Sequence, residues 1–94
     1  MPFILVHHKV ADYATWKPFF DQHAATRKAS GCQGGQLFRT AHDANELVMI
    51  LQWDNMEKAR QFAQSSDLRE VMQKAGVIGQ PEVYFLETIE DVAF

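Results

Sequence analysis

The strand-like segment at residues 46–53 is apolar on both of its faces, and any fold proposed for the chain has to cover both. Its odd positions hold Leu, Met, Leu and Trp, and its even positions include Val48 and Ile50. Residues 82–89 show the same pattern. A strand with one face in water alternates apolar and polar residues, whereas apolar residues on both parities indicate a sheet that is covered on both sides.

The chain is too short to cover both faces of such a sheet by itself. It has 94 residues, enough for two helical regions beside four strands, and two helices cover one face. A small domain buries a limited fraction of its surface alone, and association with a second copy enlarges the core. We therefore expect a homodimer in which the two sheets pack face to face.

Strand and helix signals follow one another in the order β-α-β-β-α-β. The patterns predict strands at 3–10, 36–41, 46–53 and 82–89, helices at 12–30 and 54–76, a turn at 42–45 and a loop at 79–81. The second and third strands form a hairpin. The prediction is a single α+β domain over residues 1–94 with a four-stranded antiparallel sheet.

Capping residues set the expected ends of the first helix. Asp12 is predicted to be its N-cap, and Gly31 the glycine that ends it. Pro18 cannot occupy a helix interior without the loss of a hydrogen bond. We therefore expect a short turn over 13–17, followed by a main helix with Pro18 in its first turn.

The second helical region carries two capping signals. Asp54 opens one capping box, and Asp67 opens a second directly after the Gln-Ser-Ser run at 64–66. We expect this helix to bend or restart at Ser66 and to end at Gly76.

Composition excludes several classes of protein. The formal net charge is −3 and there is no cluster of Lys and Arg, which argues against nucleic-acid binding. The single cysteine, Cys32, cannot form an intramolecular disulfide, and its glycine-rich surroundings offer no base to activate a nucleophile. The first apolar run spans residues 3–6, too short for a secretion signal or a membrane span. We expect a cytoplasmic protein without membrane contact.

The first helix carries polar groups on its apolar side. At about 100° per residue, one arc of the helix holds Tyr13, Trp16, Phe20, His23, Ala24 and Arg27. His23 and Arg27 are therefore expected to point toward the sheet. There His23 could act as an acid, a base or a ligand anchor, with Arg27 as the partner of an anion. The alternative is a core histidine bonded to a backbone carbonyl, with Arg27 extending outward at the helix end.

Two adjacent histidines in the first strand face opposite sides of the sheet. We expect His7 to face the helices together with Phe3 and Leu5, and His8 to face the dimer interface. His42 falls in the predicted turn and is expected to be solvated. The chain has no His-x-x-x-His pair and no cysteine pair, so we expect no metal site.

Large flat side chains border the expected space between helices and sheet. Trp16 and Trp53 are predicted to form two of its walls and to stack on a planar ligand, with Phe20 and Phe62 beside them. The alternative is that these aromatic residues are ordinary core.

Four local features accompany this element order: Gly31 after the first helix, Trp53-Asp54 before a helix with Ala59, Phe62 and Ser65, the stretch Asp12–Pro18, and the run Ala75–Pro81. With these features the chain resembles the dimeric α+β barrel superfamily over residues 3–89, in particular the antibiotic-biosynthesis-monooxygenase-like proteins. The resemblance implies a ferredoxin-like fold that forms a dimeric α+β barrel. Members of the superfamily include cofactor-free monooxygenases of polyketide phenols, haem-degrading enzymes, polyketide cyclases and lactone isomerases.

Haem degradation does not fit the residues present. Haem-degrading members use a histidine of the second helix as axial ligand and an asparagine on the first strand. Here no histidine follows His42, Phe62 stands where many members carry the helix-two histidine, and the strand-one position holds His7. Trp53 resembles the pocket tryptophan of these enzymes, which is consistent with a planar aromatic ligand.

We therefore predict a small-molecule-binding homodimer. If it is an enzyme, the resemblance implies a cofactor-independent monooxygenase, cyclase or isomerase acting on an aromatic or polyketide-like substrate. In that role His23 is the base, Arg27 stabilises an enolate or phenolate, and His7 is a secondary acid or orienting group. The alternative is a non-enzymatic binding or dimerisation module. A cavity of roughly 300 Å³ or more beside His23 and Arg27 favours the ligand hypothesis, and a closed core favours the module.

Overall fold

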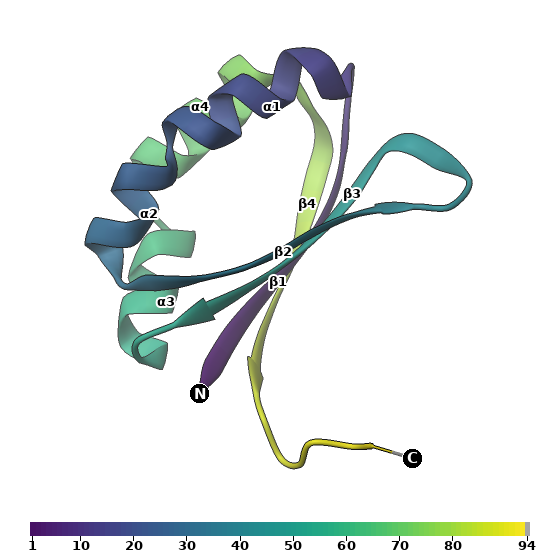
Figure 1. The fold of residues 1–94 in the computed structure, drawn as a ribbon. Coiled ribbons are helices and arrows are strands. Elements are labelled where there is room, and N and C mark those ends of the chain that lie inside the picture. The colour runs from purple at the N-terminus through teal and green to yellow at the C-terminus, as the bar shows by residue number, and fades with distance from the viewer. Residues whose placement is uncertain (94) are drawn as a thin grey trace.

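The computed structural model describes residues 1–93 and shows a four-stranded antiparallel sheet with four helices against one of its faces (Figure 1). The elements are β1 (Pro2–Val10), α1 (Tyr13–Gln22), α2 (Ala24–Ser30), β2 (Cys32–Thr40), β3 (Asp43–Trp53), α3 (Met56–Ala63), α4 (Ser66–Ala75) and β4 (Val77–Glu87). The strand order is β2-β3-β1-β4. This is the predicted ferredoxin-like fold, with each of the two helical regions divided in two.

The first helical region is interrupted at a different place from the one predicted. Asp12 is the N-cap, as expected, and its Oδ2 accepts a hydrogen bond from the Thr15 N–H at 3.0 Å. Pro18 lies inside α1 and does not begin a new helix, so that prediction is wrong. Pro18 is exposed, while Trp16 is buried in the core. Packing of this kind can outweigh the one hydrogen bond that a proline removes from a helix. The break falls at His23, between α1 and α2.

The second helical region restarts at Ser66, as predicted, but its caps differ from the predicted ones. Asn55 is the N-cap of α3 and Ser65 is the N-cap of α4, where Asp54 and Asp67 were expected. Asn55 has the extended backbone that an N-cap requires, and its side chain accepts a hydrogen bond from the Lys58 N–H at 2.8 Å.

The strands begin earlier than the sequence indicated, while β4 ends at Glu87, two residues before the predicted end. β3 begins at Asp43, inside the predicted turn, and β2 begins at Cys32. β4 begins at Val77 and includes the predicted loop at 79–81 as an irregularity. His7 pairs with Glu82 and Lys9 with Ile78, so residues 79–81 of β4 lie opposite His8 alone. The loop prediction is therefore wrong: the glycine and proline mark a bulge within a strand.

The sheet has one covered face and one open face. Alternate residues of β1 and β3 point into the core beneath the helices; they are Ile4, Val6, Val10, Leu47, Met49, Leu51 and Trp53. The intervening positions of the sheet, including Phe38, Tyr84 and Leu86, lie on the other face, where these three side chains are exposed. Within residues 1–93, apolar side chains occupy both faces, as predicted, while the helices cover one (Figure 1). None of the helices in this range combines the length and the apolar character needed to cross a bilayer.

The corrected caps generate a test of the local structure. Asn55→Ala should lower the free energy of unfolding by about 1 kcal/mol, because a first-turn N–H of α3 loses its acceptor. Asp54→Ala should cost less than about 0.5 kcal/mol, because Asp54 forms only an exposed ion pair with Lys58. Urea unfolding of both variants measures the difference. A larger loss for Asp54→Ala would restore Asp54 as the cap.

Candidate functional site

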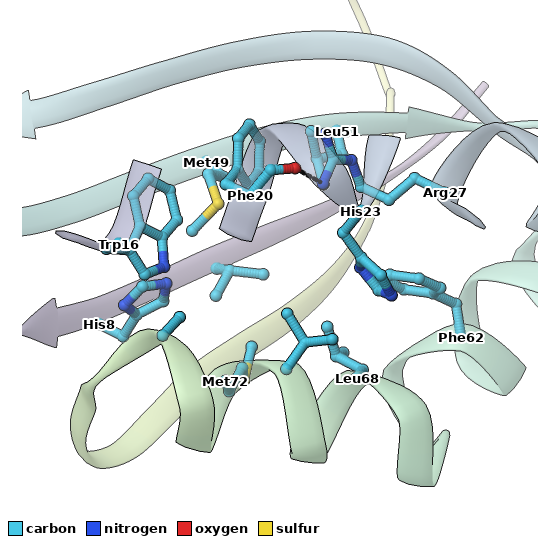
Figure 2. Close-up of a pocket in the computed structure, with 13 residues that line it drawn as sticks. His8, Trp16, Phe20, His23, Arg27, Met49, Leu51, Phe62, Leu68 and Met72 are labelled. Atoms are coloured by element: carbon cyan, nitrogen blue, oxygen red, sulfur yellow. Dashed lines mark hydrogen bonds between the residues drawn. The ribbon is translucent and has the colours of Figure 1, made fainter. Parts of the chain in front are cut away.

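A small cavity lies between the sheet and the helices α1 to α4 (Figure 2). Its volume is about 60 Å³ and its walls are mostly apolar. Three of the side chains that line it can carry charge: His8, His23 and Arg27. Figure 2 shows His8 with Trp16 at one end of the cavity, and His23, Arg27 and Phe62 at the other.

His8 is the histidine of β1 that faces the helices. Its side chain is only 4% exposed, and its ring meets Trp16 edge to face with the centroids 5.7 Å apart. Nδ1 is buried and has no hydrogen-bond partner among residues 1–93. A buried polar atom left unpaired costs about 1–3 kcal/mol, so such atoms call for an explanation. Burial lowers the pKa of His8 below 6.5, which keeps the ring neutral at neutral pH.

His7 faces the opposite side of the sheet, so the predicted orientation of the two histidines is wrong. Its Nε2 lies 2.7 Å from Glu46 Oε2 and its Nδ1 lies 3.1 Å from Glu82 Oε1. The hydrogen bond with Glu46, followed by that with Glu82, raises the pKa of His7 above 6.5. The reversal follows from the alternation along β1: Lys9 shares the parity of His7 and is exposed, whereas Val10 shares that of His8 and is buried.

His23 points into the space under the helices, as the helical period predicts, and lies at the break between α1 and α2. It is 8% exposed, and its Nε2 lies 2.8 Å from Asp67 Oδ2, at the start of α4. The partner is thus a carboxylate from a distant element, where the alternative interpretation expected a backbone carbonyl. With Asp67 ionised, Nε2 donates this hydrogen bond, and Nδ1 of the neutral ring is left as an acceptor.

Arg27 also borders the cavity, from α2. Its Nη1 donates a hydrogen bond to the Phe20 carbonyl oxygen at 2.7 Å, and the guanidinium carbon lies 3.9 Å from the centre of the Phe20 ring. No Asp or Glu of the described chain forms an ion pair with it. Partial burial lowers the pKa of Arg27, although the group stays protonated at neutral pH. The cavity therefore has an unpaired cation at its edge.

The aromatic residues fall into two groups. Trp16 and Phe20 stack with their centroids 4.9 Å apart and form one wall of the cavity. Phe62 forms part of the opposite end and lies 4.9 Å from Trp53, centroid to centroid. Trp53 is fully buried and is not among the residues that line the cavity. The structure therefore places Trp53 in the core behind Phe62, and not on the wall where it was expected.

The volume of the cavity favours a closed core more than a formed pocket. At about 60 Å³ it falls well short of the 300 Å³ that would have favoured a ligand site. An apolar cavity of about 150 Å³ holds one benzene ring. An aromatic ligand could enter only if side chains move. Met49 and Met72, which line the cavity from opposite sides, are unbranched and adapt their shape readily.

Two residues of this site were missed by the sequence analysis. His8 was assigned to the wrong face, although the parity of Lys9 and Val10 could have corrected it. Asp67 was interpreted as a helix cap, and no local signal links it to His23, which is 44 positions away.

Within residues 1–93, no group of three or more His, Cys, Asp or Glu side chains is placed to hold a metal ion.

The fold and the cavity define a ferredoxin-like α+β protein with a mostly apolar cavity beneath its helices, bordered by His8, His23 and Arg27. The family model for antibiotic biosynthesis monooxygenases matches residues 14–74. The chain belongs to this family, and the resemblance stated from the sequence is confirmed.

Solved structures share the fold at low sequence identity. A protein from Bordetella bronchiseptica, provisionally described as an antibiotic biosynthesis monooxygenase, is 17% identical with a TM-score of 0.78, and the match covers 95% of this chain and 97% of that one. One from Caulobacter crescentus, described in the same way, is 20% identical with a TM-score of 0.74 and coverage of 95% and 90%. SnoaB, a cofactor-independent oxygenase from Streptomyces nogalater, is 16% identical with a TM-score of 0.78 and coverage of 97% and 95%. Among curated protein sequences, none is significantly similar to this chain.

The burial of His8 leads to a prediction about pH. Because the folded chain disfavours its imidazolium form, the stability contributed by neutral His8 is present above pH 6.5 and is lost as the pH falls through the lower pKa of the folded state. His8→Phe should therefore lose less free energy of unfolding than the wild type between about pH 7 and about pH 5. His42→Phe, at an exposed turn residue, should behave like the wild type. Chemical denaturation at the two pH values measures this, and equal losses in His8→Phe and the wild type would contradict a neutral buried His8.

Proposed function

We propose that the protein is a homodimer in which the open faces of two sheets pack together. The support is the set of exposed apolar side chains on that face, which includes Phe38, Tyr84 and Leu86 beside the polar group around His7. The segment after β4 turns toward the same side (Figure 1) and carries Ile89, 98% exposed, and Val92, 77% exposed. Exposed apolar side chains gathered on one face are typical of an interface. A second copy would cover both the sheet and this segment.

A pair of substitutions on β4 tests the dimer. Leu86 and Val83 are 39% and 37% exposed and lie on opposite faces of the sheet. Leu86→Arg should convert the dimer to a monomer, because a buried unpaired charge at the interface is costly. Val83→Arg, the matched control, should leave the dimer intact. Sedimentation velocity distinguishes the two results. A dimeric Leu86→Arg protein, or a monomeric wild type, would contradict the proposal.

We further propose that the cavity binds a small hydroxylated aromatic molecule and that the protein acts on it without a cofactor. One observation carries this proposal: an imidazole oriented by a carboxylate and an unpaired guanidinium border the same apolar cavity. Several reactions are compatible with such a site. Family membership and the likeness to SnoaB favour oxygenation among them.

The free Cys32 thiol supports a cytoplasmic location.

The proposed chemistry begins with the removal of a proton. His23 would accept it at Nδ1, while Asp67 holds Nε2–H and stabilises the imidazolium that forms. Arg27 would stabilise the resulting enolate or phenolate oxygen. The electron-rich carbanion form of the substrate then reduces O₂ directly. Oxidation of one ring CH₂ group to a carbonyl inserts one oxygen atom, and the other leaves as water. A cyclisation or an isomerisation would start from the same deprotonated substrate.

The non-enzymatic alternative also has one specific observation in its favour, the small volume of the cavity. In that case the His23–Asp67 pair joins the start of α4 to the break between α1 and α2, and the protein serves as a binding or dimerisation module. The two functions differ in what substitution of His23 would do.

Substitution of His23 tests the proposed reaction. With hydroxylated aromatic ketones that carry an acidic CH₂ group as substrates, His23→Ala should reduce oxygen consumption about 100-fold or more, because the base is lost. His42→Ala removes a histidine far from the cavity and should retain full activity. Oxygen-electrode rates and sedimentation of the same samples separate loss of turnover from loss of the dimer. A dimeric His23→Ala protein with wild-type rates would remove His23 from the mechanism.

A further inference from the structure

Of the three titratable side chains that line the cavity, His8 is the one that the proposed reaction does not use. Nδ1 is buried and has no partner within residues 1–93, and the side chain as a whole is 4% exposed. The side chains that surround it in the cavity, including Val6, Trp16 and Met72, offer no hydrogen-bonding group that reaches it. A neutral imidazole can both donate and accept one hydrogen bond. The Lys9 backbone interacts with the ring and opposes the effect of burial on the pKa of His8, but no protein group within residues 1–93 completes the hydrogen bonding of Nδ1. A ligand at this end of the cavity could supply the missing partner.

The backbone around His8 is also arranged unusually. β1 continues its pairing with β3 through His8 and Leu47, but on the β4 side the regular pairing skips His8, opposite the bulge at residues 79–81. Bulges of this kind occur next to binding sites, where they aim one side chain. His8 is thus held by one neighbouring strand and packed edge-on against Trp16. Its orientation toward the cavity is fixed by the fold before any ligand enters.

Arg27 provides the complementary group at the other end of the cavity (Figure 2). Trp16 and Phe20 lie between the two, stacked on each other, and the Arg27 guanidinium continues this stack over the Phe20 ring. The cavity is therefore flanked by a flat aromatic wall with a neutral hydrogen-bonding group at one end and an unpaired cation at the other. A planar ring with oxygen atoms on opposite edges matches this arrangement.

We propose that His8 binds a hydroxyl of the ligand and that Arg27 binds an anionic oxygen at its opposite edge, so that the cavity takes a planar aromatic hydroxy acid or its phenolate equivalent. This inference rests on the proposed ligand-binding function and names the class of its ligand. His8 is a binding and positioning residue in this arrangement, and His23 remains the base. The substrate would be held at two edges, with its ring against Trp16 and Phe20.

Two matched pairs of probes test the inference. 6-Hydroxy-2-naphthoate and 2-naphthoate differ only in a hydroxyl at the far edge from the carboxylate, and 4-hydroxybenzoate and benzoate are the single-ring equivalents. Isothermal titration calorimetry gives a Kd for each probe. The wild type should bind the hydroxylated member of at least one pair about tenfold more tightly, since one hydrogen bond to a buried group contributes roughly that factor. In His8→Phe this preference should vanish, while the affinity for the probe without the hydroxyl stays within about twofold of the wild type.

Further variants separate His8 from its surroundings. His8→Gln keeps a hydrogen-bonding group and should retain part of the preference for the hydroxyl. Arg27→Met should weaken every carboxylate probe about tenfold or more, whereas Lys28→Met, which removes an exposed charge on the same helix, should have no effect.

The outcomes distinguish the two levels of the proposal. If the probes bind and His8→Phe retains the wild-type preference for the hydroxyl, the role of His8 is wrong, while the ligand-binding function stands. The same conclusion follows if the wild type binds both members of each pair equally. If no probe of either size binds the wild type, the ligand-binding function fails and this inference fails with it.

Discussion

Side chains alternate between the two faces of the sheet along β1 and β3, and the two faces have different environments. One set of alternate residues forms the core beneath the helices, and the other set forms the open face, where apolar residues lie beside His7 and Lys9. A shift of one residue in register would exchange the two sets completely. The cavity, the proposed dimer interface and the opposite environments of His7 and His8 all depend on this alternation. Adjacent residues of identical chemistry thus become a neutral buried group and a carboxylate-paired group on opposite sides of one strand.

The breaks in the helices bring the polar groups of the cavity together. His23 lies where α1 ends and α2 begins, and Asp67 lies in the first turn of α4, just after the gap that follows α3. The hydrogen bond between them joins the two breaks at 2.8 Å and leaves the second nitrogen of His23 available. In the sequence, His23 is simply a histidine on the apolar side of a helix. Its hydrogen-bond partner, Asp67, lies 44 positions away in the chain.

Much of the fold could be predicted from the sequence, because strand and helix periods are local properties. The same period placed His23 and Arg27 on the inner side of the first helical region. Which of two adjacent histidines faces inward depends on the whole strand, and Lys9 and Val10 hold that information better than the histidines do. The placement of Trp53 behind Phe62 and the pairing of Asp67 with His23 depend on contacts between distant elements. No spacing in the sequence reveals such contacts.

The two breaks also divide the helix layer into two blocks. α1 packs against α4 and α2 against α3, and Figure 1 shows the two pairs one after the other along the sheet. The cavity is lined from both blocks, by Trp16 and Leu68 from one and by Arg27 and Phe62 from the other. The cavity therefore lies across the boundary between the two blocks. The space available to a ligand therefore depends on how closely the two pairs of helices pack against each other, and not on any one helix.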